Sequence, residues 1–204
     1  ELLNTLYLLI DSYIEQFGHS LYKIDVIGDC VMVVSGLTPN SLDKNIRYHA
    51  QYICDFAENI LSAVAEVNSR FLIKEKYGTE LKMRVGIHSG WAISAVVGKT
   101  APKFWVFGRD CYIAEQMEQT CEPNRIQITQ STYELLKRCY IEQRIPPKHI
   151  VEERGNVPLH ALQRSIKTFW LKGKTTIATL QKEIQDLQKK LAFLENNIHK
   201  HNEA

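Results

Sequence analysis

The sequence predicts an α+β layer fold in which helices alternate with short antiparallel hairpins. Apolar residues recur at spacings of three and four over residues 1–17 and 46–67, a pattern typical of amphipathic helices. Short runs rich in β-branched residues, bounded by glycine-containing turns, indicate strands between and after them. The 204 residues are 45% hydrophobic, which is enough for one ordinary domain with its own core and an appendage.

The first helix is predicted to end at Gly18, because glycine is common just after a helix. Residues 21–27 and 31–34 are predicted strands on either side of the turn Gly28-Asp29-Cys30, so this hairpin carries an acid at its tip. A loop over 37–41 then leads into the long helix, which is expected to end before residue 77.

In the second half, residues 82–88 are predicted to form a strand, with residues 91–98 as its hairpin partner. Two further helices are expected over 111–120 and 130–139. Strands are predicted at 126–129 and 168–171, which completes the alternation of helices and strands.

Charge and cysteine content narrow the class of protein. The 25 Lys and Arg nearly balance the 23 Asp and Glu, giving a net charge of +2 and little reason to expect a nucleic-acid partner. Five scattered cysteines without metal-type spacing predict reduced thiols and an intracellular protein facing the cytosol. No apolar run approaches the roughly 20 residues of a membrane helix. Because the chain begins at Glu1 without a signal-peptide pattern, we expect one piece of a larger or membrane-attached protein.

The last segment, residues 175–200, has a different pattern and is predicted to be a coiled coil. Its apolar residues alternate at spacings of three and four, as in a heptad seam. A helix packed back on the domain is the alternative, but its apolar stripe is usually wider. The seam therefore favours a coiled-coil partner. It consists of Ile177, Leu180, Ile184, Leu187, Leu191, Leu194 and Ile198.

Four residues are candidates for chemistry, and each has a simpler structural interpretation. Asp29 on its turn could bind a divalent cation, or could merely form the turn. Arg84 in a strand could clamp a phosphate, or could make a structural ion pair. His88 is expected to be a hydrogen-bonded turn histidine, and Trp105 alone most simply indicates an aromatic core position.

Taken together, several motifs resemble the catalytic domain of class III nucleotide cyclases, in that family's order and approximate spacing. The resemblance covers about residues 1–171 and implies a ferredoxin-like domain over 1–172 that works as a head-to-tail pair with active sites between its halves. The family's first strand, which carries one metal-binding aspartate, would precede residue 1. The motifs are Tyr22–Leu37, Met83–Gly90, Lys103–Gly108, Ala114–Glu118, Arg125–Thr129 and Ser165–Phe169.

The resemblance also implies roles for individual residues. Asp29 matches the second of two aspartates that bind Mg²⁺ or Mn²⁺, and Arg84 matches an arginine that contacts phosphate. Asp25 and Trp105 occupy the two purine-recognition positions. Tyr112 and Gln116 replace the asparagine and arginine that orient the ribose and stabilise the transition state, so the chain supplies no catalytic residue of that kind. Losses of such a cation commonly cost a factor of roughly a thousand in rate.

The retained and lost residues together predict a specialised half of a cyclase. The pattern is similar to the metal-donating first half of membrane adenylyl cyclases and to the α subunit of soluble guanylyl cyclase, and implies a complementary half as partner. Alone, the chain is expected to be inactive. The alternatives are a catalytically dead pseudocyclase that serves as a dimerisation or scaffold module, and a nucleotide-sensing domain. An RNA-binding ferredoxin-like domain is disfavoured by the charge balance.

Overall fold

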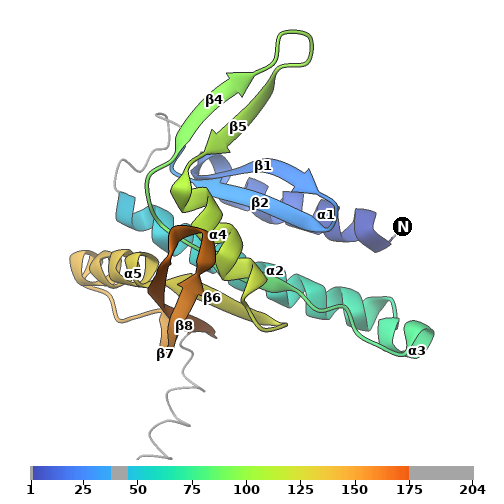
Figure 1. The fold of residues 1–204 in the computed structure, drawn as a ribbon. Coiled ribbons are helices and arrows are strands. Elements are labelled where there is room, and N and C mark those ends of the chain that lie inside the picture. The colour runs from blue at the N-terminus through green and yellow to red at the C-terminus, as the bar shows by residue number, and fades with distance from the viewer. Residues whose placement is uncertain (1, 38–45, 175–204) are drawn as a thin grey trace, which may run out of the picture.

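The structure, a computed structural model, describes residues 2–37 and 46–174 (Figure 1). The predicted coiled coil over 175–200 lies outside the described residues, as does most of the predicted loop over 37–41. The described residues end at 174, just after the domain boundary that is predicted to follow residue 172. The coiled coil, the loop and the boundary stay predictions.

The N-terminal elements confirm the predicted helix and hairpin. Helix α1 (Leu2–Gln16) is followed by a 3-10 turn, η1 (Gly18–Ser20), and by the antiparallel strands β1 (Leu21–Ile27) and β2 (Cys30–Ser35). The apolar face of α1 buries Ile10 against Phe56 and Ile60 of the long helix α2 (Ile46–Arg70), which is followed by the short α3 (Ile73–Tyr77). This packing holds the hairpin beside α2.

The later part of the chain contains a four-stranded sheet, with its strands in the order β3-β6-β8-β7. Its strands are β3 (Arg84–Ile87), β6 (Arg125–Thr129), β7 (His149–Leu159) and β8 (Arg164–Lys174), with a 3-10 turn, η2 (His160–Leu162), between the last two. The β3–β6 pair is parallel and the other two pairs are antiparallel.

Helices cover both faces of this sheet. Ile126 and Ile128 of β6 pack against α2 and α5 (Gln130–Gln143). Between them Gln127 points the other way, where its Nε2 lies 3.2 Å from Met117 Sδ of α4 (Arg109–Gln119). None of the helices in the described part of the chain combines the length and apolar character that crossing a bilayer needs.

One predicted strand pairing is wrong. Residues 91–98 do not pair with 82–88: β4 (Ile93–Val97) pairs with β5 (Lys103–Phe107), and β3 takes β6 as its neighbour. The physical reason is burial, because Ile87 of β3 belongs to the sheet core while every residue of β4 is exposed. The β4–β5 hairpin projects away from the rest of the molecule (Figure 1).

Strand β7 was not predicted. Its sequence, HIVEERGNVPL, mixes charged residues, a glycine and Pro158, and lacks a continuous apolar alternation. It lies at the edge of the sheet, where a proline is tolerated because no neighbour needs its missing N–H.

Helix α4 lies directly on β3 at Gly86. A Cβ atom built there would come within 2.0 Å of the backbone nitrogen of Glu118 and 2.4 Å of the carbonyl carbon of Met117. We expect Gly86→Ala to lower the free energy of unfolding by about 3 kcal/mol, because backbone on both sides must move apart. Denaturant unfolding measures this. Gly155→Ala is the control, because no atom lies within 4 Å of its Cβ position. Only the positive φ of 113° should destabilise this variant, so we expect its free energy of unfolding to fall by about 1 kcal/mol. Equal losses in both variants would contradict the close contact.

Candidate functional site

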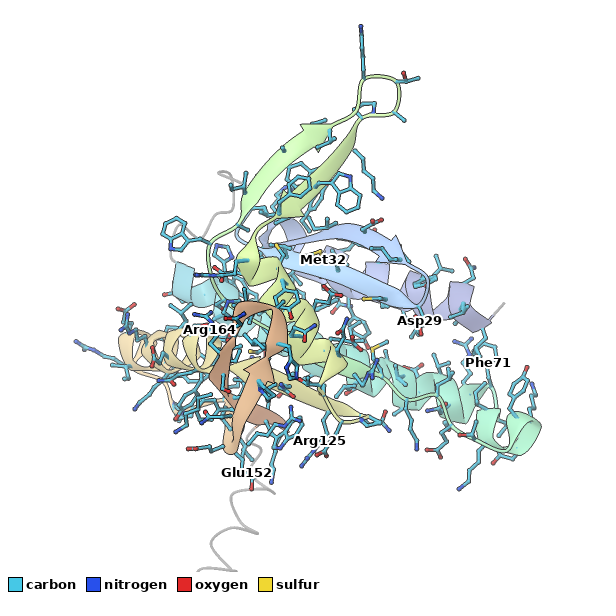
Figure 2. All side chains as sticks on the ribbon, viewed as in Figure 1. Asp29, Met32, Phe71, Arg125, Glu152 and Arg164 are labelled. Atoms are coloured by element: carbon cyan, nitrogen blue, oxygen red, sulfur yellow. The ribbon has the colours of Figure 1, made fainter. Side chains whose placement is uncertain are left out.

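Asp29 lies at the exposed tip of the β1–β2 hairpin (Figure 2). Gly28 before it has a φ of 64°, which glycine adopts without steric cost. The Tyr7 hydroxyl of α1 donates a 2.6 Å hydrogen bond to the Gly28 carbonyl. The tip is thus anchored to α1 while the carboxylate faces solvent.

Arg84, the first residue of β3, points to the same side as Gly86, toward α4. Its Nε donates to Glu118 Oε1 at 2.9 Å, and the two side chains are 46% and 28% exposed. Burial raises the pKa of the nearby Cys30 thiol, and the charges of Glu118 and Asp29 raise it further, whereas Arg84 lowers it. The charges of Asp29 and Arg84 therefore both act on the Cys30 thiol.

Asp25 and Trp105, the two positions predicted to recognise the purine, both contact Lys103. The Lys103 ammonium donates to Asp25 Oδ1 at 2.7 Å and lies 4.7 Å from the centre of the Trp105 ring. The hydrogen bond from Lys103 is the main cause that holds the pKa of Asp25 below its usual value. Trp105 is half-buried and stacks on Phe107, with ring centroids 6.1 Å apart, and it faces away from the buried Val106. The core position expected for Trp105 alone is therefore wrong.

Lys103 is a site residue that the motifs do not predict. Its position two residues before Trp105 in a strand places both on one face, which is a usable signal. The contact with Asp25 joins residues 78 positions apart, and only the packing of β1 against β5 reveals it.

Tyr112 and Gln116 lie one turn apart on α4. Both are half-buried, and the Gln116 amide donates to Gln119 Oε1 at 2.8 Å. Neither side chain carries a positive charge. This side of the helix therefore offers hydrogen bonds but no cation at the two replaced positions.

His88 has the structural role expected of it. Its Nδ1 lies 2.9 Å from Thr129 Oγ1, and its Nε2 lies 3.3 Å from Asp110 Oδ1. Burial lowers the pKa of this imidazole. Asp110 also accepts a 2.7 Å hydrogen bond from the Trp91 amide, so the network fixes the start of α4 next to β3.

Comparison with known proteins decides the family. The model of the adenylate and guanylate cyclase catalytic domain matches residues 1–173. The chain belongs to this family. It is 31% identical over 182 residues to receptor-type guanylate cyclase gcy-23 of Caenorhabditis elegans, covering 89% of the chain and 15% of that protein. Human retinal guanylyl cyclase 2 is 36% identical over 174 residues, covering 85% and 14%. The chain thus spans about one-seventh of these relatives.

The fold agrees. The guanylate cyclase domain of RhGC from Catenaria anguillulae, solved with GTP, superposes with a TM-score of 0.66 at 22% identity, over 85% of this chain and 82% of that one. The predicted mixed α/β cyclase architecture is confirmed.

Cyclase catalytic domains of this class use Mg²⁺ or Mn²⁺. At the hairpin tip, Asp29 fits one ligand of such an ion, because it is an exposed carboxylate on an anchored turn. The Glu118 carboxylate is paired with Arg84. The part of the chain that the structure describes therefore offers one half of a two-aspartate set.

Proposed function

We propose that this cyclase domain is one half of a paired active site that converts a nucleoside triphosphate to a cyclic nucleotide and pyrophosphate. Asp29 contributes to metal binding and Arg84 contacts phosphate. The observation that carries the proposal is an asymmetry between the candidate residues: Asp29 is an exposed carboxylate on an anchored turn and Arg84 is a half-exposed cation, whereas Tyr112 and Gln116 on α4 carry no positive charge. The chain alone is inactive.

The chemistry explains why such a half needs a partner. The ribose 3′ oxygen forms a bond to the α-phosphorus, the bond to the pyrophosphate oxygen breaks, and the hydroxyl proton is released. Negative charge grows on the phosphoryl oxygens during this step. Bound divalent ions supply Lewis-acid stabilisation of that charge. Arg84 would exchange Glu118 for phosphate oxygens, which an arginine fork binds bidentately. The remaining cation comes from the complementary half.

The β4–β5 hairpin supplies a surface for that half. Ile93, Val97 and Phe107 are 71%, 48% and 44% exposed and share one face of the hairpin with Trp105. A soluble domain rarely leaves such an apolar face uncovered, which marks it as an interaction surface. Catalytic domains of this family work as dimers, so we assign the face to a complementary cyclase half.

The proposal also covers the bounds of the domain, the segment after it and its place in the cell. Residues 1–172 form the cyclase domain, and the predicted coiled coil over 175–200 adds a second contact with a partner. We place the domain on the cytoplasmic side of its cell. The relatives are receptor and retinal guanylyl cyclases, which supports that placement.

A pseudocyclase is the second candidate, and one contact favours it. Lys103 joins Asp25 to Trp105, so the polar and aromatic groups at the purine-recognition positions already engage each other. An indole in this position fills space that a purine needs. In this alternative, the fold serves as a dimerisation or scaffold module.

Complementation tests the proposal. The chain, extended upstream to include the strand expected to carry the first metal aspartate, is mixed with a partner cyclase half. This partner carries the asparagine and arginine at the positions of Tyr112 and Gln116, but its own metal aspartates are replaced by alanine. Cyclic nucleotide formation from ATP and GTP with Mn²⁺ is measured. We expect turnover only in the mixture, because each half supplies what the other lacks. A mixture as inactive as its parts would favour the pseudocyclase.

A further inference from the structure

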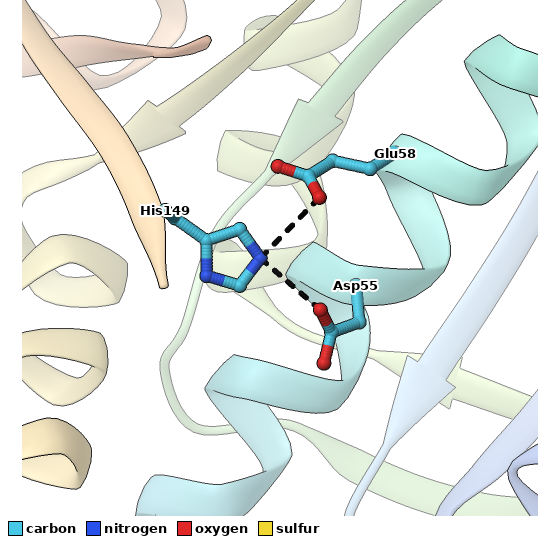
Figure 3. A group of neighbouring side chains, drawn as sticks. All are labelled: Asp55, Glu58 and His149. Carbon is cyan, nitrogen blue, oxygen red and sulfur yellow. Dashed lines mark ion pairs between the residues drawn. The ribbon is translucent and has the colours of Figure 1, made fainter. Parts of the chain in front are cut away.

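We propose that Asp55, Glu58 and His149 bind a divalent transition-metal ion, with Zn²⁺ as the best-suited probe, and that the ion ties α2 to the start of β7 (Figure 3). None of these residues belongs to the proposed cyclase site. Asp55 and Glu58 are three positions apart on α2 and share one face of the helix. His149 is the first residue of β7 and points between the two carboxylates.

The spacing of the ligand atoms fits a shared ion. His149 Nε2 lies 3.3 Å from Asp55 Oδ1 and 3.7 Å from Glu58 Oε2, and the three ligand atoms all lie within 4.8 Å of one another. Two ligands that each lie about 2.0–2.1 Å from a tetrahedral ion are about 3.3–3.4 Å apart. A direct charge-assisted hydrogen bond would be shorter, at about 2.7–2.9 Å.

The burial and orientation of His149 also favour a metal site. The His149 side chain is fully buried, and its Nε2 makes no hydrogen bond although it is aimed at both carboxylates. The other ring nitrogen, Nδ1, is hydrogen-bonded to the Tyr140 hydroxyl. An outer partner of this kind fixes the ring and its tautomer in metal sites, so that Nε2 is presented as a ligand.

The charges of the cluster favour a dication. Asp55 and Glu58 are each 10% exposed, and buried carboxylates require compensating charge. Lys148 lies 3.0 Å from Asp55 Oδ2, which leaves Oδ1 directed toward His149. A bound dication would add positive charge directly beside both carboxylates.

An ion in this position has a structural role. It would join two segments about 90 positions apart in the chain and connect the helical layer to the edge of the sheet. A metal that binds the folded chain and not the unfolded one stabilises the fold by mass action.

The test measures metal content and thermal stability of the full chain. After dialysis against Zn²⁺ and then metal-free buffer, we expect one Zn²⁺ per chain by elemental analysis. At Zn²⁺ about 100 times above the dissociation constant, the Tm should rise by roughly 5 to 10 °C over the chelator-treated protein. His149→Gln and Glu58→Gln should each abolish both effects. His160→Gln, at an exposed histidine on η2, is the matched control and should retain them.

Two results would overturn the site. One is no bound Zn²⁺ and no change in Tm, which would mean that the cluster is stable in the folded chain without a metal ion. The other is binding that persists in both variants, which would place the ion elsewhere. Glu58→Gln nearly preserves the shape of the side chain, so it provides the answer if His149→Gln does not fold. Neither readout depends on cyclase activity.

Discussion

Replacing Asp29 with alanine lowers the kcat of the native cyclase complex by at least about a thousandfold. The carboxylate is the one metal-binding aspartate of the proposed site in the described chain, and it lies on a turn anchored by Tyr7. Removing it takes one of the two aspartate ligands from the metal site while the turn geometry, set by Gly28, stays intact. The measurement is cyclic nucleotide formation by the complex over a range of Mn²⁺ concentrations.

Two controls separate chemistry from folding in this experiment. Asp29→Asn keeps the shape of the side chain and removes the charge, so it should lose nearly as much activity. Glu134→Ala removes another exposed carboxylate, from α5, and should leave kcat unchanged. Full activity in Asp29→Ala would show that the site on this half is not used, as in a pseudocyclase.

Replacing Ile93 with lysine separates the two halves. Ile93 is 71% exposed on the apolar face of the β4–β5 hairpin, opposite Phe107. A lysine there would have to be desolvated in the interface, so we expect the dissociation constant of the pair to rise about a hundredfold. Sedimentation or surface-binding measurements with the complementary half test this.

Ser94→Lys is the matched control, because it introduces the same charge one position along, on the opposite face of β4. It should leave the dissociation constant within a factor of a few. If both lysine variants bind the partner as tightly as the natural chain, the halves meet through another surface.

Local patterns predict much of this fold. The apolar periodicity of residues 1–17 and 46–67 corresponds to α1 and α2, and the glycine turn at 28 corresponds to the β1–β2 hairpin. These elements form because nearby residues determine them. The pairing of β4 with β5 and the strand β7 depend on which surfaces are buried in the assembled sheet, and no local pattern records that.

The candidate site, like the fold, can be predicted only in part from the sequence. Motif resemblance singles out Asp29, Arg84, Asp25 and Trp105 one by one, and their roles stay predictions. It does not reveal that Glu118 pairs with Arg84 or that Lys103 joins Asp25 to Trp105, because those contacts arise from tertiary packing. The cluster around His149 was missed for the same reason: its ligands come from α2 and β7 and match no spacing motif.

The most direct test of the central claim is the turnover of the isolated chain. Cyclic nucleotide formation from ATP and GTP is measured with Mn²⁺ over protein concentrations high enough for self-association. Because Tyr112 and Gln116 supply neither the ribose contact nor the cation, the account predicts no product above the enzyme-free background at any concentration. Turnover that increases with the square of the protein concentration would show an active homodimer and would contradict it.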